Sequence, residues 1–302
     1  MARGRFGKVL TAMVTPFTDA GDLDLDGAVT LARWLLAHGS DGLVLAGTTG
    51  EGPTLSDDEK VELWTAVRAA VDAPLLAGSG SNDTRHTRHL SERAAAAGVD
   101  GLLVVAPYYN KPSQAGMEAH FRAVAEATRL PIVVYDIPGR TGRKVDTDVL
   151  VRLAQDVPTI VGVKDAAGNP GETARLVAAA PADFDVLSGD DPMTLPLLAV
   201  GASGVVGTAT HWCGEVMADL IASFEKGDHD RARELNASLF ESYAYESRDS
   251  AQFALAVKVA LRCLGLPSGP CRLPLGPEPP ELEAEAGAML DRLGRPTAGG
   301  AA

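Results

Sequence analysis

The stretch GLVLAGTTGEGPTLSDDEKVELWTAVRAAVDAPLLAGS, residues 42–79, contains the repeating unit from which the fold can be predicted. Apolar, β-prone residues at 42–47 and 74–79 indicate two buried strands. Between them, apolar positions recur at helical spacing, and Ser56 with Glu59 matches the capping box that starts many helices. A strand, a helix and a second strand in this order are typical of a parallel sheet covered by helices.

The same alternation continues along most of the chain. Eight such units in about 225 residues match the number and length of a (β/α)8 TIM barrel. An open doubly wound sheet is the alternative, but no GxGxxG follows the first strand, which disfavours a dinucleotide-binding version. The predicted strands are 9–14, 42–47, 74–79, 101–107, 132–138, 160–165, 185–189 and 204–209, and the clearest helical stretches are 29–39, 56–71, 87–98 and 117–129.

The strand pattern stops after the eighth unit. Residues 228–265 are predicted to form two helices, and a Pro/Gly-rich connection at 264–281 leads to a short helix at about 281–293. We therefore divide the chain into a catalytic barrel, residues 1–227, and a C-terminal helical segment with a loose tail, residues 228–302.

The composition is that of an ordinary globular protein, with 46% apolar and 22% charged residues. A formal net charge of −13 argues against nucleic acid as a partner, because like charges repel. Cys213, Cys263 and Cys271 form no CxxC pair or metal-ligand spacing, which fits a reducing compartment. No apolar run reaches the ~20 residues of a membrane helix, and the N-terminus lacks a signal-peptide cleavage site. We expect a soluble, cytoplasmic protein that contacts no membrane.

Polar residues follow the ends of the predicted strands, where TIM barrels carry their active sites. The set contains a lysine, three tyrosines and an arginine, but no His/carboxylate or Cys/His cluster that would bind a catalytic metal. The segments are Thr15-Pro16, GTTGE at 47–51, Gly78-Ser79, PYYN at 107–110, YDIPGRT at 135–141, KDAAG at 164–168, SGDD at 188–191 and GTATH at 207–211.

Lys164 ends the apolar strand IVGVKD, an unusual place for a strongly hydrated cation. One interpretation is a lysine whose amine reaches water along its aliphatic stem. The other is a nucleophile that forms a Schiff base and must be neutral, although the free amine has a pKa near 10.4. Burial among valine and isoleucine lowers the pKa of an amine. Asp165 is expected to face away, since successive strand residues alternate.

The remaining candidates have both structural and chemical interpretations. Tyr135 is either an apolar ring with a wet tip or a phenol that transfers protons to a carbinolamine. Thr48 and Thr49 are either turn residues or, respectively, a link in a proton relay and a carboxylate ligand. Arg140, in a tight loop after Pro138-Gly139, is either solvated or a fork for a second carboxylate. Gly189 lets the backbone approach a ligand closely.

Tyr108 and Tyr109 are adjacent, so they face opposite ways from an extended segment. We expect one to face a pocket and the other a neighbouring subunit. The plainer interpretation is a pair of surface aromatic residues at an interface.

Five motifs occur in order at the strand ends: GTTGE, PYYNKPSQ, YDIPGRT, VGVKDAAGN and SGDD. Together they resemble the dihydrodipicolinate synthases, within the pyruvate-dependent class I aldolases that also include N-acetylneuraminate lyase. GASGVV and LGLPSGPCRLPL are similar too, so the resemblance covers nearly the whole chain. It implies a (β/α)8 barrel with a C-terminal helical segment, usually a homotetramer built as a dimer of dimers.

The resemblance also implies the reaction, in which pyruvate condenses with L-aspartate 4-semialdehyde to 4-hydroxy-tetrahydrodipicolinate in lysine and diaminopimelate biosynthesis. Lys164 would form an imine with pyruvate, without metal or organic cofactor, and Tyr135 would be the acid and base. Thr48 and Tyr109 would complete a proton relay, with Tyr109 lent by a partner subunit. The implied binding residues are Thr49 for the pyruvate carboxylate, Arg140 for the carboxylate of the semialdehyde, and Gly189 and Val206 for the walls of the pyruvate pocket.

The chain departs from the family pattern at several positions. Gly207 replaces a common serine and His211 a frequent asparagine, and both could tune the pocket. Lysine-regulated relatives bind the inhibitor through residues matching Asn82, Tyr108 and a glutamate at the position of His86. Because a histidine offers no carboxylate to the lysine ammonium group, we expect weak or absent inhibition.

Three other functions use part of the same pattern. A sister aldolase acting on sialic acid or a keto-deoxy sugar acid would share the lysine and tyrosine, but Arg140 and the Thr-Thr pair favour a small carboxylated aldehyde. A non-catalytic pyruvate-binding relative would form no covalent adduct. A pyridoxal phosphate enzyme using Lys164 would be yellow.

Overall fold

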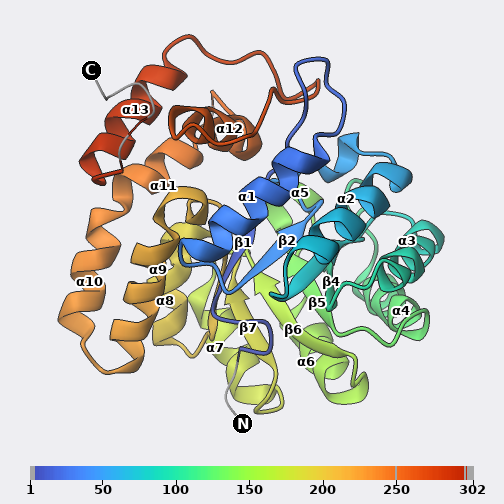
Figure 1. Cartoon of the computed structure of the whole chain (residues 1–302). Helices are drawn as coiled ribbons and strands as arrows, with labels where there is room; N and C mark the ends of the chain where they lie inside the picture. The colour runs from blue at the N-terminus through green and yellow to red at the C-terminus, as the bar shows by residue number, and fades with distance from the viewer. Residues whose placement is uncertain (1–3, 249, 296, 298–302) are drawn as a thin grey trace.

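The computed structural model describes residues 4–248, 250–295 and 297. Eight parallel strands form a closed barrel in which neighbours in sequence pair and β8 closes on β1 (Figure 1). The predicted (β/α)8 barrel is therefore confirmed. The strands are β1 Val9–Ala12, β2 Gly42–Leu45, β3 Leu75–Gly78, β4 Gly101–Val105, β5 Ile132–Asp136, β6 Ile160–Asp165, β7 Asp185–Ser188 and β8 Gly204–Gly207.

Helices surround the strands, and five of the barrel helices, α1, α2, α3, α4 and α7, begin directly after a residue whose side chain accepts a hydrogen bond from a backbone N–H of the first turn. The capping box that precedes α2 is formed: Ser56 N–H donates to Glu59 Oε2 at 2.8 Å, and Glu59 N–H donates to Ser56 Oγ at 3.2 Å. The barrel helices are α1 Leu25–Ala37, α2 Asp57–Ala70, α3 Thr84–Ala96, α4 Gln114–Glu126, α5 Pro138–Thr141, α6 Thr147–Asp156, α7 Pro170–Ala179, α8 Thr194–Ala199 and α9 Thr210–Glu225, with short 3₁₀ turns η1 Gly52–Thr54 and η2 Asp191–Met193.

The C-terminal helices pack beside α9 and over one end of the barrel (Figure 1). The prediction of two helices at 228–265 is wrong, because three occur there. The break falls at Leu239, whose φ of −94° and ψ of −5° are close to helical, and neither glycine nor proline marks it. Tertiary contacts fix the extra helix, since Tyr245 donates to Ala256 O at 3.0 Å. The helices are α10 His229–Ser238, α11 Phe240–Glu246, α12 Phe253–Cys263 and α13 Leu282–Arg292.

Strand alternation divides the buried side chains into two layers. One layer fills the barrel interior and includes Tyr135, Leu187 and Val206. The larger layer lies between the strands and the helices and includes Val134 and Val163. Tyr135 therefore points into the barrel although its strand neighbours point outward.

Candidate active site

Lys164 lies inside the barrel beside Tyr135. The two residues are directly paired between β6 and β5, and the Lys164 Nζ is 4.4 Å from the centroid of the tyrosine ring. Both side chains are buried, with Lys164 only 4% exposed. The lysine is not the solvated surface residue of the plainer interpretation.

The surroundings of Lys164 favour a neutral amine more than water does. Burial lowers the pKa of Lys164 to about 8, although the charges of Asp191 and Glu246 act in the opposite direction. Asp165 does not oppose the shift, because it faces away as predicted. Its carboxylate accepts hydrogen bonds from Ala167 N–H at 2.9 Å and from the Thr173 hydroxyl at 2.6 Å.

Tyr135 holds its proton at neutral pH. Burial raises the pKa of the phenol to about 12, and the charge of Arg140 and a hydrogen bond with Thr48 lower it in part. When the Lys164 amine is neutral and attacks a carbonyl carbon, the protonated phenol beside it can donate a proton to the hydroxyl group that then leaves as water.

A cavity of about 530 Å³ opens at the carboxyl ends of the strands. Thr48, Tyr135 and Arg140 line it, and the Lys164 amine lies over the Tyr135 ring. Thr49 is buried, with its hydroxyl 3.4 Å from that of Thr208. The structure thus brings the GTTGE hydroxyls to the same end of the barrel as the lysine and tyrosine.

Arg140 lies in the short helix α5, not in the predicted loop. The C-terminal segment holds its guanidinium: Nη2 donates to Gln252 Oε1 at 3.1 Å, and the group lies 4.9 Å from the centre of the Phe253 ring. The side chain remains exposed and lines the cavity. It is placed where an anion entering the cavity would meet it.

Gly189 and Val206 lie beside the buried lysine stem and in the barrel interior, respectively. A Cβ atom on Gly189 would be 2.9 Å from Lys164 Cγ, so a side chain there would displace the lysine. Val206 is 1% exposed and belongs to the inner layer with Tyr135. The close approach of the Gly189 backbone explains why this position has no side chain.

The adjacent tyrosines separate as predicted. Tyr108 lines the cavity, whereas Tyr109 is 88% exposed and has a left-handed backbone with φ of 71°. Within one chain Tyr109 therefore does not join Lys164 and Tyr135. A non-glycine residue with positive φ is uncommon, so the backbone of this loop is strained at the residue that exposes the Tyr109 ring.

A buried carboxyl pair near Lys164 escaped the sequence analysis. Asp191 and Glu246 are each 3% exposed, and burial raises the pKa of both groups. The interaction between the two carboxyl groups raises the pKa of Glu246 further and partly offsets the effect of burial on Asp191. Asp191 stands in the quoted SGDD motif, but no sequence signal links it to a glutamate on α11.

The two departures, Gly207 at the end of β8 and His211 in α9, have structural explanations. A Cβ atom on Gly207 would lie 2.5 Å from Asp191 Oδ1, so glycine leaves the space that this carboxylate occupies. His211 is fully buried, accepts Val14 N–H at Nε2 over 3.1 Å and donates from Nδ1 to Thr208 O over 2.7 Å. Burial lowers the pKa of His211 to about 4, and the neutral ring joins the backbone at Val14 to that at Thr208. The expected effect of His211 on the pocket stays a prediction.

A second buried pair joins the GTTGE motif to the C-terminal segment. Lys258 Nζ lies 2.6 Å from Glu51 Oε1, and both side chains are completely buried. The other Glu51 oxygen accepts Arg272 N–H at 2.9 Å. The Phe17 ring lies 4.1 Å from the Lys258 amine and 4.3 Å from the Arg272 guanidinium.

Two further features concern cofactors and membranes. Within residues 4–248, 250–295 and 297, no three His, Cys, Asp or Glu side chains gather as a metal site would require. In the same described ranges, no helix is both long and apolar enough to span a bilayer.

Comparison with known proteins gives one consistent result. A model of the Dihydrodipicolinate synthetase family matches residues 5–293. The 4-hydroxy-tetrahydrodipicolinate synthase of Moorella thermoacetica is 47% identical over 96% of this chain and 99% of its own, and that of Acidothermus cellulolyticus is 53% identical over 89% and 87%. The crystal structure of DHDPS from Cyanidioschyzon merolae with lysine bound has a TM-score of 0.93 at 40% identity, covering 96% of this chain and 98% of that one. The chain therefore belongs to the dihydrodipicolinate synthetase family.

Proposed function

We propose that this chain is a lyase that condenses pyruvate with L-aspartate 4-semialdehyde to 4-hydroxy-tetrahydrodipicolinate, in lysine and diaminopimelate biosynthesis. The observation that carries the proposal is Lys164, a buried amine with a lowered pKa that lies 4.4 Å from the ring of a protonated Tyr135. The named relatives support this function over a sister aldolase acting on a sugar acid.

The reaction begins at the Lys164 amine. The neutral amine attacks the pyruvate carbonyl carbon, and Tyr135 protonates the carbinolamine hydroxyl so that water leaves and an imine forms. The protonated imine withdraws electrons, so loss of a proton from the methyl group gives an enamine. The enamine carbon attacks the aldehyde of the second substrate. The amine of that substrate then displaces Lys164 and closes the ring.

The supporting residues have separate roles in this proposal. Thr49 binds the pyruvate carboxylate, and Gly189 and Val206 shape the pyruvate pocket. Arg140 binds the carboxylate of the semialdehyde at the cavity mouth. Thr48 carries protons between Tyr135 and Tyr109, and its effect on the pKa of Tyr135 supports that link.

The proposal extends to assembly and location. Tyr109 reaches the site of a partner subunit, and two such dimers form a homotetramer. The imine serves as the electron sink, so neither a metal nor an organic cofactor takes part. The barrel, residues 1–227, carries the chemistry, and residues 228–302 support it, as the contacts of Lys258 and Gln252 with barrel residues suggest. We place the protein in the cytoplasm.

A coupled assay with both substrates tests the function. Wild-type protein should turn over pyruvate and aspartate semialdehyde, Lys164→Ala should lose activity, and Lys226→Ala, which removes an exposed lysine on the molecular surface, should remain active. No turnover of that pair by the wild type, together with cleavage of a sugar acid, would contradict the proposal.

A further inference from the structure

Two carboxylates follow the reactive residues on the outer side of the barrel. Asp136 comes directly after Tyr135, Asp165 comes directly after Lys164, and the two aspartates are paired between β5 and β6. Main-chain contact joins the same strand ends, since Ala166 N–H donates to Asp136 O at 2.9 Å. A contact that holds or displaces either aspartate therefore acts on the residue next to Tyr135 or Lys164.

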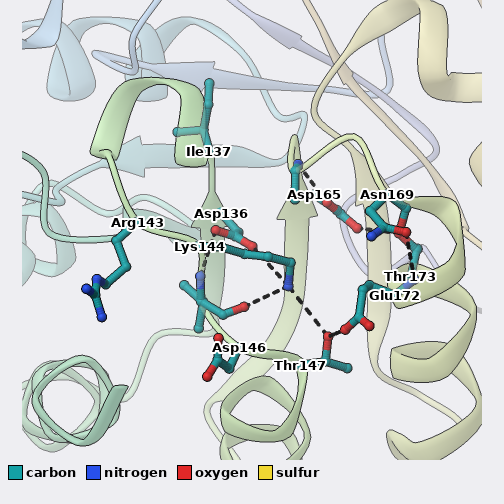
Figure 2. Close-up of polar contacts among 12 residues, drawn as sticks. Asp136, Ile137, Arg143, Lys144, Asp146, Thr147, Asp165, Asn169, Glu172 and Thr173 are labelled. Atoms are coloured by element: carbon teal, nitrogen blue, oxygen red, sulfur yellow. Dashed lines mark hydrogen bonds and ion pairs between the residues drawn. The ribbon is translucent and has the colours of Figure 1, made fainter. Parts of the chain in front are cut away.

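Asp136 is held by the segment that precedes α6 (Figure 2). Its Oδ1 accepts Val145 N–H at 3.0 Å, and its Oδ2 lies 3.8 Å from Lys144 Nζ. The Asp136 side chain is only 2% exposed, and burial raises its pKa to about 6. The carboxylate therefore depends on these few contacts for its charge.

Lys144 connects this carboxylate to two helices. Its amine donates to Val145 O at 2.9 Å and to the Thr147 hydroxyl at 3.5 Å. The Thr147 hydroxyl in turn donates to Glu172 on α7 (Figure 2). The chain of contacts runs from β5 through Lys144 to the first turns of α6 and α7.

The charges around Asp136 are unbalanced without Lys144. Asp165 from β6 and Asp146 from the segment before α6 both raise the pKa of Asp136, and Lys144 lowers it. Glu172 faces Lys144 from α7, and the charge of Lys144 helps to lower the pKa of that glutamate. Lys144 thus lowers the pKa of both Asp136 and Glu172, and it opposes the effect of Asp165 and Asp146 on Asp136.

We propose that Lys144 is a positioning residue, which pairs with Asp136 and so fixes the strand ends that carry Tyr135 and Lys164. The inference rests on the proposed function for the identity of the reactive pair. Lys144 touches neither of those side chains in the contacts described above, and it acts through the backbone of β5.

Replacing Lys144 by methionine keeps the aliphatic stem and removes the charge. Asp136 would then hold its proton to a higher pH, because burial, Asp165 and Asp146 would still raise its pKa and the charge of Lys144 would no longer lower it. A protonated carboxyl accepts the Val145 N–H bond less strongly, so the end of β5 loosens. A small displacement of the tyrosine should slow imine formation by on the order of tenfold at neutral pH.

The test measures how fast pyruvate becomes trapped on the protein by borohydride, as a function of pH. In the wild type, protonation of Lys164 slows the rate below about pH 8, and protonation of Asp136 adds a second fall near pH 6. Lys144→Met should move the second fall to higher pH, and Lys144→Arg should restore it. Asp136→Asn should remove it. Arg143→Met, at an exposed neighbour that points away from Asp136 in Figure 2, should leave the profile unchanged.

An unchanged profile in Lys144→Met, even with a lower melting temperature, would overturn the inference, because it would show a structural role alone. If no variant traps pyruvate, including the wild type, the proposed function fails instead. In that case the pairing of Lys144 with Asp136 is still tested by a double-mutant cycle of Lys144→Met and Asp136→Asn, measured by urea unfolding at pH 8. Coupling between the two changes would support the pairing, and additive effects would overturn it.

Discussion

Burial acts in opposite senses on the two reactive side chains. It lowers the pKa of the Lys164 amine to about 8 and raises that of the Tyr135 phenol to about 12. In both cases the uncharged form is favoured, because a dry interior penalises charge of either sign. One environment therefore prepares a nucleophile and an acid together, and each half of this arrangement can be tested separately.

The titration of Lys164 gives the first prediction. Imine formation with pyruvate should increase with pH and level off above about pH 8, since the amine is then neutral. Quenched-flow trapping with borohydride would measure it. A rate that continues to rise toward pH 10 would show an amine with its ordinary pKa.

Tyr135→Phe tests the proton transfer. The change removes the phenol hydroxyl but keeps the buried ring, so the fold should persist and kcat should fall by about 10²- to 10⁴-fold. Circular dichroism and steady-state kinetics would check the two parts. Thr48→Val, which removes the hydroxyl that lowers the phenol pKa, should give a smaller loss. Wild-type kcat in Tyr135→Phe would exclude the tyrosine as the acid.

The side chains at the strand ends can be predicted from the sequence, but the residues that contact them from distant parts of the chain cannot. Lys164 could be predicted because an apolar strand that ends in lysine is itself a local signal. Glu246 could not, since its pairing with Asp191 depends on how α11 packs against the barrel. Lys258 was missed for the same reason, because it lies in an apolar helix where nothing local indicates Glu51.

The strands and helices of the barrel can be predicted from local sequence patterns. The contacts between the barrel and the C-terminal helices cannot. Each of the eight strands was predicted because parallel strands are buried on both faces and form continuous apolar runs. The division of 228–265 into three helices lacks such a signal at Leu239. The contacts that join α12 to the GTTGE motif are therefore best probed by mutation.

Lys258→Met should destabilise the protein strongly, because it leaves the Glu51 carboxylate buried without its cation. Loss of one member of a buried ion pair typically costs about 3–5 kcal/mol. Urea unfolding would measure the cost, with the exposed Lys226→Met as the control. Adding Glu51→Gln should recover part of the loss, and an equal or larger loss in the double variant would contradict the pairing.

At the scale of the whole molecule, the single chain leaves Tyr109 outside its own site. The ring is 88% exposed, so its proposed role requires a second subunit. Activity should fall on dilution in step with dissociation, as measured by sedimentation and a continuous assay. A fully active monomer would show that Tyr109 is not needed. The strand and helix pattern of one chain does not indicate this contact, because it depends on how two copies of the chain pack against each other.

Regulation is the second prediction at this scale. Asn82, Tyr108 and His86, at the positions where lysine-regulated relatives bind the inhibitor, line one cavity together with Asp57. His86 Nε2 lies 2.9 Å from Asp57 Oδ2, and Lys60 Nζ lies 4.0 Å from Asp57 Oδ1, so this carboxylate is already paired. We expect L-lysine to inhibit weakly or not at all. Steady-state assays with added lysine would check it, and clear inhibition below millimolar lysine would contradict it.

The most direct test of the account is to reduce the protein with borohydride in the presence of pyruvate and map the modified peptide by mass spectrometry. We predict one reduced pyruvate adduct per chain, located on Lys164 and lost in Lys164→Ala. An unmodified protein, or an adduct on a different lysine, would contradict the claim that a dry, neutral amine inside the barrel carries the reaction.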